Sequence, residues 1–164
     1  EGDAGNSAIV TAVNAKDYGN GIWDGMNLQI SLENKAFRKG YLAPAQKAKD
    51  FLQNQIGSHN IHSTCLPGIY PFNLNNLFPI AISNRLSSTL KYCNHIFPEF
   101  YTNSILIAPE TRTSSPIKIL RKKNELSSLS AANLYTIGEG SGYSGGIISS
   151  AADGWRLGKR FRIR

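Results

Sequence analysis

The sequence predicts an α/β protein, with α+β character in this stretch of chain, and two observations support that fold class. Apolar residues recur at helical spacing in four stretches, and short apolar runs of strand type lie among them. Toward the end of the chain, residues 133–137 form such a run, and a glycine-rich turn and an apolar helix start follow directly. This strand, turn and helix order is one in which α/β proteins commonly bind phosphate groups.

The first third of the chain predicts one strand and two helices. Residues 7–13 (SAIVTAV) form a short apolar run with alternation, which is typical of a strand. Over residues 22–37 apolar side chains recur at helical spacing, with Asp24 as the N-cap and Gly40 as the stop. Proline is favourable in the first turn of a helix, so we expect a second helix over residues 44–56, whose first residue is a proline.

The remainder of the chain predicts a long loop, two helices and three strands. Residues 58–79 are rich in Asn, Pro, Gly and Ser, which is the composition of a loop. Apolar spacing predicts a helix over residues 86–97, and Pro98 would end it. Short apolar runs predict strands over residues 104–108, 117–120 and 133–137, and residues 147–160 read as the helix after the glycine-rich turn.

Length and composition describe a protein that can fold. With 164 residues and 41% hydrophobic side chains, the chain can build the core of one ordinary domain. Its only methionine is Met26, so we interpret the chain as a processed product or a piece of a longer protein. Cys65 and Cys93 form no C-x-x-C pair, which favours a reducing compartment: the cytoplasm or, in a eukaryote, the plastid stroma. No apolar run approaches the roughly 20 residues of a membrane span, so we expect a soluble protein with no membrane partner.

The net charge of +7 is concentrated toward the C-terminus. Residues 1–111 hold eight basic and eight acidic side chains, whereas residues 112–164 hold ten basic and three acidic ones. Nucleic-acid binding is one interpretation of such a basic end. Few aromatic residues lie between the charges, and a helix C-terminus attracts cations anyway, so we expect a solvated basic end and no nucleic-acid partner. The basic side chains form two groups: Arg121, Lys122 and Lys123, and a tail with Arg156, Lys159, Arg160, Arg162 and Arg164.

Five of the fifteen glycines fall within residues 138–146 (GEGSGYSGG). Glycine is used where the backbone takes a positive φ or where a ligand must approach with no Cβ in the way. The amides at the start of the following helix carry a partial positive charge and form a ready anion site. A glycine-rich loop between packed elements, with no ligand, is the competing interpretation.

Three sharper interpretations compete for the same residues, and two of them rest on short motifs. Gly140, Gly142 and Gly145 fit the dinucleotide fingerprint G-x-G-x-x-G, but the acidic residue expected about 20 positions later has no place in this sequence. Residues 142–146 also fit G-x-S-x-G, the nucleophile elbow of α/β-hydrolases. That fold places its histidine after the serine, whereas all three histidines here lie upstream. A Walker A loop is excluded because no Gly-Lys-Ser/Thr occurs.

The third interpretation rests on a resemblance. Residues 110–117 (ETRTSSPI), followed after a short spacer by residues 133–147 (NLYTIGEGSGYSGGI), resemble the C-terminal end of the uncharacterised FAD-dependent dehydrogenase family, the NAD(FAD)-utilising oxidoreductases. Residues 41–52 (YLAPAQKAKDFL) are similar to the interior of the same family, so the resemblance covers most of the chain.

The resemblance implies the C-terminal part of a Rossmann-like FAD/NAD(P)-binding flavoprotein with an inserted substrate or cap domain. Residues 1–109 would be part of the inserted domain, and residues 110–164 the returning FAD-binding segment, without the N-terminal Rossmann unit. The implied function is an FAD-dependent oxidoreductase that acts on an unknown small molecule, with NAD(P)H as a candidate electron donor and no activity expected of this segment alone. The rival hypothesis is a non-catalytic, truncated module that binds RNA or a protein partner through its basic end.

By motif position, the resemblance implies eight residues that bind the cofactor. Glu139 would accept hydrogen bonds from sugar or ribityl hydroxyls, and Tyr143 would pack near the flavin ring. The helix start would offer amides to the pyrimidine edge, where the helix dipole stabilises the negative charge of a reduced flavin. The set is Gly138, Glu139, Gly140, Gly142, Tyr143, Gly145, Gly146 and Ile147.

Arg112 and Thr113 are the candidate substrate-binding residues. The Arg112 guanidinium could bind a substrate carboxylate or the phosphates of a nicotinamide donor. The alternative is an ion pair with Glu110 or Glu139 that orders the loop. No acid, base or nucleophile stands out as catalytic, as expected where a flavin does the chemistry.

A zinc site is the remaining hypothesis. His59, His62 and Cys65 are spaced three apart, and Cys93 or His95 could supply a fourth ligand. The spacing lies in a loop and resembles none of the usual ligand frameworks. We therefore expect no metal.

Overall fold

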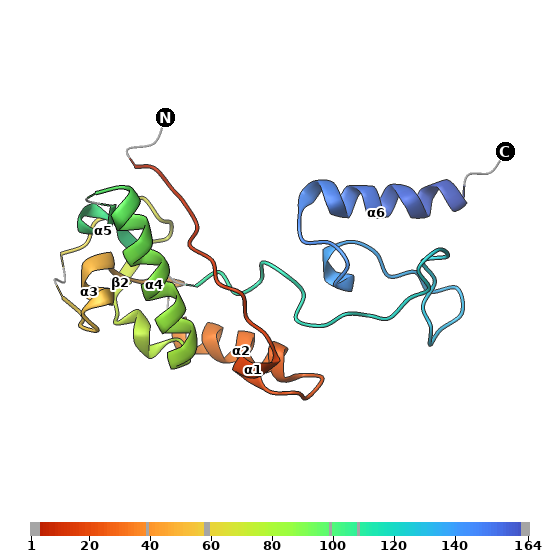
Figure 1. The fold of residues 1–164 in the computed structure, drawn as a ribbon, viewed down its shortest axis with the longest axis horizontal. Helices are drawn as coiled ribbons and strands as arrows, with labels where there is room; N and C mark the ends of the chain where they lie inside the picture. The colour runs from red at the N-terminus through yellow and green to blue at the C-terminus, as the bar shows by residue number, and fades with distance from the viewer. Residues whose placement is uncertain (1–3, 39, 58–59, 99, 108, 162–164) are drawn as a thin grey trace. The chain divides into compact units, whose positions relative to one another are not determined.

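A computed structural model describes residues 4–38, 40–57, 60–98, 100–107 and 109–161 of the chain. The chain divides into two compact units, which we describe separately (Figure 1). Unit 1 comprises Glu1–Asn20 and Leu28–Pro109, and unit 2 comprises Gly21–Asn27 and Glu110–Arg164.

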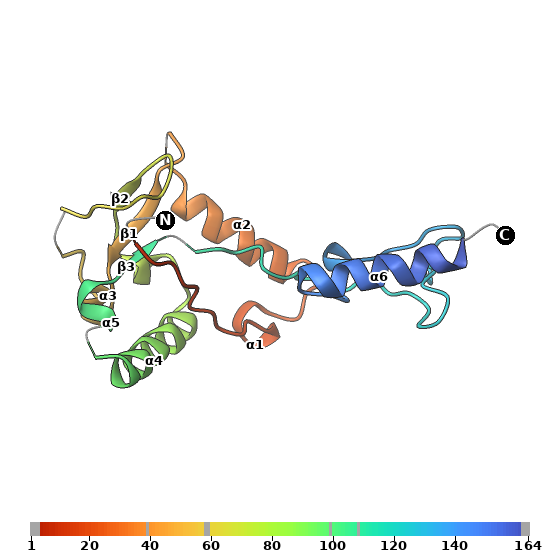
Figure 2. The ribbon, with the colours of Figure 1, turned by 90° about the horizontal axis from the view of Figure 1, so that it is seen from above.

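Unit 1 contains a three-stranded sheet whose central strand is β1 (Ala43–Lys47). The strand β2 (Ile69–Pro71) pairs with β1 in parallel, and β3 (Ile105–Ile107) pairs with it antiparallel (Figure 2). Among the residues that the structure describes, five helical segments belong wholly to this unit, and a sixth crosses the unit boundary. The mixed α/β class is therefore confirmed, while the Rossmann-like arrangement stays a prediction. The helical segments are α1 (Ala15–Tyr18), α2 (Asp24–Ala36), α3 (Ala48–Leu52), η1 (Leu74–Asn76), α4 (Ile80–Ile96) and α5 (Phe100–Asn103), and α2 is the one that crosses.

The helix predicted over residues 44–56 was wrong in its first half, where the structure has β1. The N–H of Ala43 and the C=O of Ala45 both hydrogen bond on the β2 side, at 2.9 and 3.0 Å. Pro44, between them, therefore faces the other edge, toward β3, whose pairing among the described residues runs from Ala45 with Ile107 to Lys47 with Ile105. The proline, which has no N–H to donate, therefore interrupts no hydrogen bond between β1 and β2.

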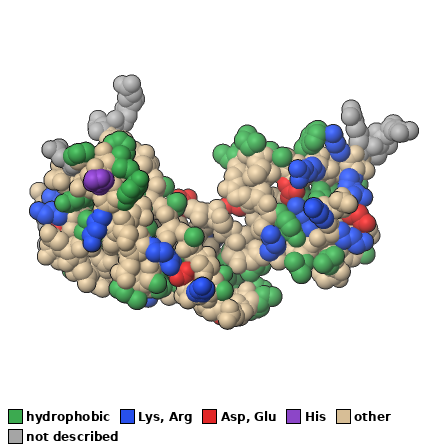
Figure 3. All heavy atoms as spheres, viewed as in Figure 1, with side chains coloured by type: hydrophobic (Ala, Val, Ile, Leu, Met, Phe, Trp, Pro, Cys, Tyr) green, Lys and Arg blue, Asp and Glu red, His purple; other side chains and the backbone are tan. Residues whose placement is uncertain are grey.

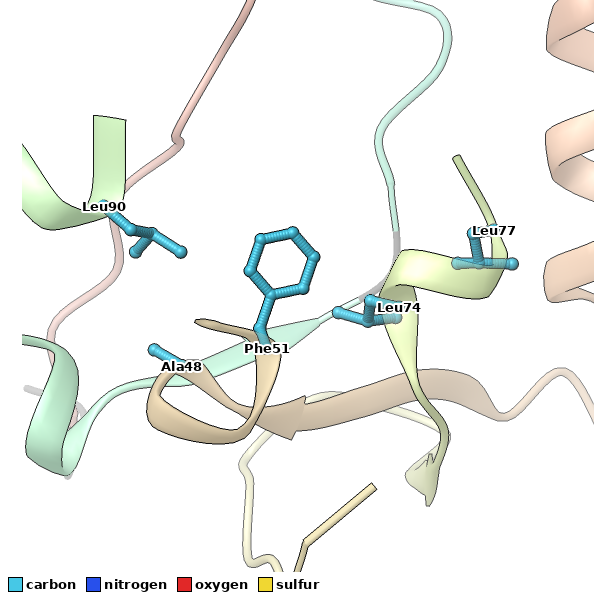
Figure 4. Packing of buried hydrophobic residues seen from close by; sticks show 5 residues of the cluster. All are labelled: Ala48, Phe51, Leu74, Leu77 and Leu90. Atoms are coloured by element: carbon cyan, nitrogen blue, oxygen red, sulfur yellow. The ribbon is translucent and has the colours of Figure 1, made fainter. Parts of the chain in front are cut away.

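A small apolar core covers one part of this sheet. Figure 4 shows the ring of Phe51, from α3, between Leu90 of α4 and Leu74 of η1. Phe51 is 2% exposed and Leu90 1% exposed, so both side chains contribute nearly their full burial free energy, about 1.5 to 3 kcal/mol each. The cluster consists of Ala48, Phe51, Leu74, Leu77 and Leu90.

A buried amide connects the sheet to the elements around this core. Gln46 in β1 is fully buried, its Nε2 donates to the backbone oxygen of Gln55 at 3.1 Å, and its Oε1 accepts from the N–H of Leu74. A buried polar side chain is tolerated when its hydrogen bonds are made. Gln46 therefore orients the loop after α3 and the start of η1 relative to β1.

The predicted strand at residues 7–13 was wrong, because that stretch pairs with no other strand. Side chains hold it instead. Arg85 of α4 donates from Nε to the Thr11 hydroxyl at 3.1 Å and from Nη2 to Asp17 Oδ1 at 2.9 Å. The N-terminal segment is thus attached to α4 by polar contacts that alternation of apolar residues does not reveal.

Several other predictions for unit 1 were confirmed with shifted ends. The helix expected over residues 22–37 is α2, with Asp24 as its first residue, and its carboxylate accepts from the N–H of Gly21 at 2.8 Å. The third helix is α4, which begins at Ile80 and ends before Pro98, while the loop expected over residues 58–79 contains β2 and η1. β3 lies within the strand expected over residues 104–108, of which Ala108 is outside the described residues.

Unit 2 contains a short η2 (Glu139–Ser141) and the longer α6 (Ile147–Arg160), so the helix after the glycine-rich turn is confirmed. The strands expected over residues 117–120 and 133–137 were wrong. Two isolated bridges, Arg121 with Ser128 and Ser127 with Tyr135, are the pairing found in that part of the described chain. The neighbouring backbone gives these runs only isolated contacts, such as Leu129 N–H to the Leu120 oxygen at 3.2 Å and Ser128 N–H to the Leu134 oxygen at 2.8 Å, and these do not extend into a strand. Among the described residues no helix is long and apolar enough to traverse a bilayer.

Candidate cofactor site

Two motifs that lie apart in the sequence meet in unit 2. The N–H of Ile119 donates to the backbone oxygen of Ser141 at 3.1 Å, which places the segment after ETRTSSP against the glycine-rich turn. Ser114 lies near the other end of the turn, since its Oγ would be 3.8 Å from a Cβ on Gly145. The two late motifs that carry the resemblance therefore form one local structure.

Two glycines of the turn are required by the chain itself. Gly138 has a φ of 75° and Gly142 a φ of 78°, in the left-handed region that residues with a Cβ adopt at a cost. A Cβ on Gly142 would also lie 2.4 Å from the backbone oxygen of Ile117. These two positions bracket η2 and give the turn its shape.

The other three glycines have no such internal reason. Gly140, Gly145 and Gly146 are not in the left-handed region, and a Cβ on any of them would meet no atom closer than 3.7 Å. For Gly140 nothing lies within 4 Å. Gly140 faces open space, and Gly145 and Gly146 have room for a Cβ at ordinary contact distance, as expected where a group from outside the chain comes close to the backbone.

The N-terminus of α6 has hydrogen-bonding capacity to offer. Its N-cap is Gly146, which has no side chain to accept from the first helical amides. The Ser149 hydroxyl instead bonds to the Gly146 N–H and C=O, at 3.1 and 2.9 Å. Ile147, the first helical residue, is 89% exposed. The first amides of a helix without a cap carry a partial positive charge and can bind an acceptor or an anion.

A buried ion pair lies beneath the turn. Arg121 Nη1 and Nη2 each donate to one oxygen of Asp153 in α6, at 2.8 Å, and the two side chains are 6% and 7% exposed. Asp153 Oδ2 also accepts from the N–H of Gly138 at 2.9 Å. The hydrogen bonds from Arg121 outweigh the effect of burial and hold the pKa of the Asp153 carboxyl below its ordinary value, and the Gly138 N–H acts in the same direction.

Sequence reasoning missed this pair and misplaced Arg121. We assigned Arg121 to a basic cluster with Lys122 and Lys123, but it is buried and ion-paired, whereas Lys122 is exposed beside Glu125 at 3.0 Å. A separation of 32 residues gives no local signal that two charges will pair. The one signal in the sequence was Asp153, an aspartate within the amphipathic stretch that forms α6.

Tyr143 belongs to the same network. Its ring has the Arg121 guanidinium 4.0 Å from the centroid and the Lys118 ammonium at 4.7 Å, and its hydroxyl accepts from the Arg121 backbone N–H at 3.3 Å. Cation–π contacts of this kind contribute about 0.5 to 2 kcal/mol. The ring therefore helps hold the turn, and packing on a flavin stays a prediction.

The remaining predicted site residues are accessible. Glu139 is half-buried at the start of η2, and its backbone oxygen accepts from Gly142 N–H at 2.9 Å. Arg112 and Thr113 are exposed and directly precede Ser114, so they lie on the segment that borders the turn.

Of the residues weighed for zinc, those that the structure describes form no metal site. Within the described ranges no group of three or more His, Cys, Asp or Glu side chains could hold a metal ion. Cys65 lies in the loop before β2 and Cys93 in α4, both half-buried and with free thiols, and His59 is outside the described residues.

Lys and Arg side chains gather on the face of unit 2 seen in Figure 3. Two of those on α6 have partners: Lys159 lies 3.7 Å from the Trp155 ring centroid, and Arg160 Nη1 donates to the Asn124 backbone oxygen at 2.7 Å. Arg156 is exposed, and Arg162 and Arg164 lie outside the described residues.

Comparison with known proteins gives two matches. A Clostridium beijerinckii protein whose name is "Uncharacterized protein" is 32% identical over 162 residues, which is 94% of this chain but 30% of that protein. The chain thus spans less than a third of the length of this relative. A family model described as "FAD-dependent protein, C-terminal domain-like" matches residues 1–113, which include all described residues of unit 1 and stop before the glycine-rich turn. The chain therefore belongs to the FAD-dependent protein, C-terminal domain-like family.

Proposed function

We propose that this chain is the C-terminal part of an FAD-dependent oxidoreductase and that unit 2 supplies its returning FAD-binding segment. The observation that carries the proposal is the set of three glycines, Gly140, Gly145 and Gly146, which the chain does not need for its own packing. They lie beside a helix start that no side chain caps. The family description, which contains FAD dependence, supports the same cofactor.

The residues of the turn fit the chemistry of a dinucleotide. Backbone approach over Gly140 would let a pyrophosphate or ribityl chain pass close to the peptide, and the Glu139 carboxylate would accept from its hydroxyls. The Gly146 N–H already donates to the Ser149 hydroxyl, so the amide at Ile147 would be the one to face an electron-rich acceptor, for which the pyrimidine edge of a flavin is suited. When bound, the flavin would supply hydride or electron transfer, and NAD(P)H is the candidate donor.

For unit 1 we propose the role of the inserted cap or substrate domain. Arg112 and Thr113, which lie in unit 2 at the border of the turn, are the substrate-binding residues that we propose. A guanidinium there suits a carboxylate or phosphate on the small molecule. Neither side chain is assigned a step in proton or electron transfer.

The exposed side of α6 supports a larger protein around this site. Asp153 and Leu157 turn toward the rest of unit 2, whereas Ile147, Ile148 and Trp155 are 89%, 82% and 62% exposed. Apolar side chains of this size on one helix face are typical of a surface that another protein segment covers. The relative, of which this chain matches 30%, has the length to provide one.

Flavin binding after gel filtration tests the proposal, both in the 164-residue chain and in the whole gene product that contains it. We expect flavin absorbance to co-elute with protein in at least the whole gene product. Gly140→Val and Gly146→Val should remove it while leaving far-UV circular dichroism unchanged, because a Cβ meets nothing within 4 Å at Gly140 and only the Ser149 hydroxyl, at 3.7 Å, at Gly146. Gly158→Val, in the last turn of α6 where a Cβ also meets nothing within 4 Å, is the matched control.

Two results would contradict the proposal. One is a folded but colourless protein in both forms, which would favour the non-catalytic module; a steep salt dependence of RNA affinity would then support RNA as its partner. The other is undiminished flavin in the Gly140 and Gly146 variants, which would place any flavin elsewhere.

A further inference from the structure

The buried Arg121–Asp153 ion pair carries a desolvation free energy that opposes its formation. Moving two charges out of water costs several kcal/mol per ion, so a buried ion pair is weak evidence for a gain in stability. Here both carboxylate oxygens and both terminal guanidinium nitrogens are engaged, and both side chains are more than nine-tenths buried. Such a pair is better explained by what it orients than by the stability it adds.

Among the described residues, the other hydrogen bonds and the ring contact of these two side chains involve the glycine-rich turn or its approach. Arg121 Nη1 donates to the backbone oxygen of Thr136 at 2.6 Å, just before the turn, and the guanidinium lies over Tyr143, within it. Asp153 Oδ2 accepts from Gly138, whose φ of 75° begins the turn. One ion pair thus holds the entry of the turn, its middle and the helix that follows.

The pair also sets where α6 begins relative to the turn. Asp153 lies six residues after Ile147 in the same rigid helix, and its carboxylate is fixed to Gly138. If that carboxylate shifts, the helix N-terminus and the turn shift relative to each other. A misplacement of about 1 Å can reduce the function of a site about a hundredfold.

We propose that Arg121 and Asp153 are positioning residues: without contacting the cofactor, they hold the Gly138–Gly142 turn and the N-terminus of α6 in the arrangement that binds FAD. This inference rests on the proposed function. It assigns a role to two residues that no motif singles out. It also explains why two charged side chains are buried here, which a gain in folding stability does not explain.

The test is Arg121→Lys, which keeps the charge but loses the two-pronged contact with the carboxylate. Asp153→Asn is the reciprocal change, which keeps the size of the side chain but loses its charge. The control is Arg85→Lys, because Arg85 also pairs with an aspartate, through one contact from Nη2 to Asp17 Oδ1 at 2.9 Å, but is 39% exposed and lies in unit 1. FAD affinity is measured by fluorescence titration at a temperature where each variant is folded, in the 164-residue chain and in the whole gene product.

We expect Arg121→Lys and Asp153→Asn to weaken FAD binding about 10- to 100-fold, the range found when partners that orient metal ligands are removed. Arg85→Lys should leave affinity unchanged. The fold loss of FAD affinity in the double variant should be smaller than the product of the two single fold losses, because both substitutions remove the same contact. Hydrogen exchange at Gly138 and through the turn should accelerate in both variants and stay unchanged in the control.

A merely structural role would lower the unfolding midpoint and leave the affinity and absorption spectrum of the folded, flavin-bound protein as in the wild type. That result would overturn the inference and leave the proposed function standing. If the wild-type protein binds no flavin in either form, both fall. Unchanged exchange at Gly138 in the variants would also overturn the inference.

Discussion

A Cβ atom placed on Gly57 would lie 1.8 Å from Oδ2 of Asp50. Gly57 has a φ of 68°, and the loop after α3 therefore brings its backbone directly against a carboxylate that is itself buried, at 8% exposure. A side chain at this position has no space and the wrong backbone conformation.

Gly57→Ala should therefore lower the free energy of unfolding by about 2 kcal/mol or more, since the left-handed conformation alone costs about 1 kcal/mol and the overlap adds to it. Chemical denaturation measures the loss. Gly40→Ala separates the two causes, because Gly40 has a φ of 84° but a Cβ there meets nothing within 4 Å. Equal losses in the two variants would show that the contact with Asp50 contributes nothing.

Gln46→Met should destabilise unit 1 by about 1 to 3 kcal/mol, although the two side chains are similar in size. The change leaves the Leu74 N–H and the Gln55 carbonyl without the partner that Gln46 provides, and an unsatisfied buried group costs this much. Urea denaturation measures it. Gln53→Met, at an exposed position, is the control, and a neutral Gln46→Met would mean that water replaces the amide.

Gly142→Ala should destabilise the glycine-rich turn through contacts inside the chain. Its Cβ would lie 2.4 Å from the Ile117 oxygen and its φ of 78° disfavours alanine, so we expect a loss of about 2 kcal/mol or more. Gly140→Ala should leave the unfolding free energy within about 0.5 kcal/mol of the wild type. Denaturation monitored by Trp fluorescence distinguishes them, and equal stability of both variants would argue against the packing of Ile117 on the turn.

Acid should weaken the contact between the turn and α6. The Asp153 pKa is lowered in the folded protein, so its contribution to stability is complete above the unfolded carboxyl pKa, about 3.9, and is lost as the pH falls through the lower folded value. Unfolding free energies from pH 6 to about pH 2 should converge between wild type and Asp153→Asn at the acid end.

Glu125→Gln is the control for that pH series. Glu125 also has a lowered pKa, chiefly from its hydrogen bond to Lys122, but this pair is about half exposed. Its pH-dependent difference should be small and should vanish in 1 M salt, whereas the Asp153 difference should persist because burial limits screening. A difference at Asp153 that disappears with salt would contradict the burial of the pair.

Local pattern was sufficient for the elements whose stability is local. α2, α4 and α6 repeat apolar residues at helical spacing, and a helix makes its backbone hydrogen bonds within its own segment, so the sequence predicted all three. The same holds for the left-handed glycines at the turn, because a cluster of glycines signals unusual backbone wherever it occurs.

The strands and the buried ion pair of the candidate site could not be predicted from local sequence patterns. Residues 7–13, 117–120 and 133–137 have strand-like patterns, but the described chain brings at most an isolated bridge or single hydrogen bonds beside them. Pro44, by contrast, lies in a central strand, where Ala43 and Ala45 make the hydrogen bonds to the β2 side. A strand is a property of two segments, and a local window contains only one.

The sequence by itself determined the helices, the glycine-rich turn and the family resemblance, because each depends on residues that are close together in the chain. Only the tertiary structure decided that ETRTSSP lies against that turn, that Gly140, Gly145 and Gly146 remain open, and that Arg121 meets Asp153 across 32 residues. Contacts of this kind join segments that are far apart in the chain. The free energy that stabilises them comes from burying two residues together, so no single stretch of sequence reveals it.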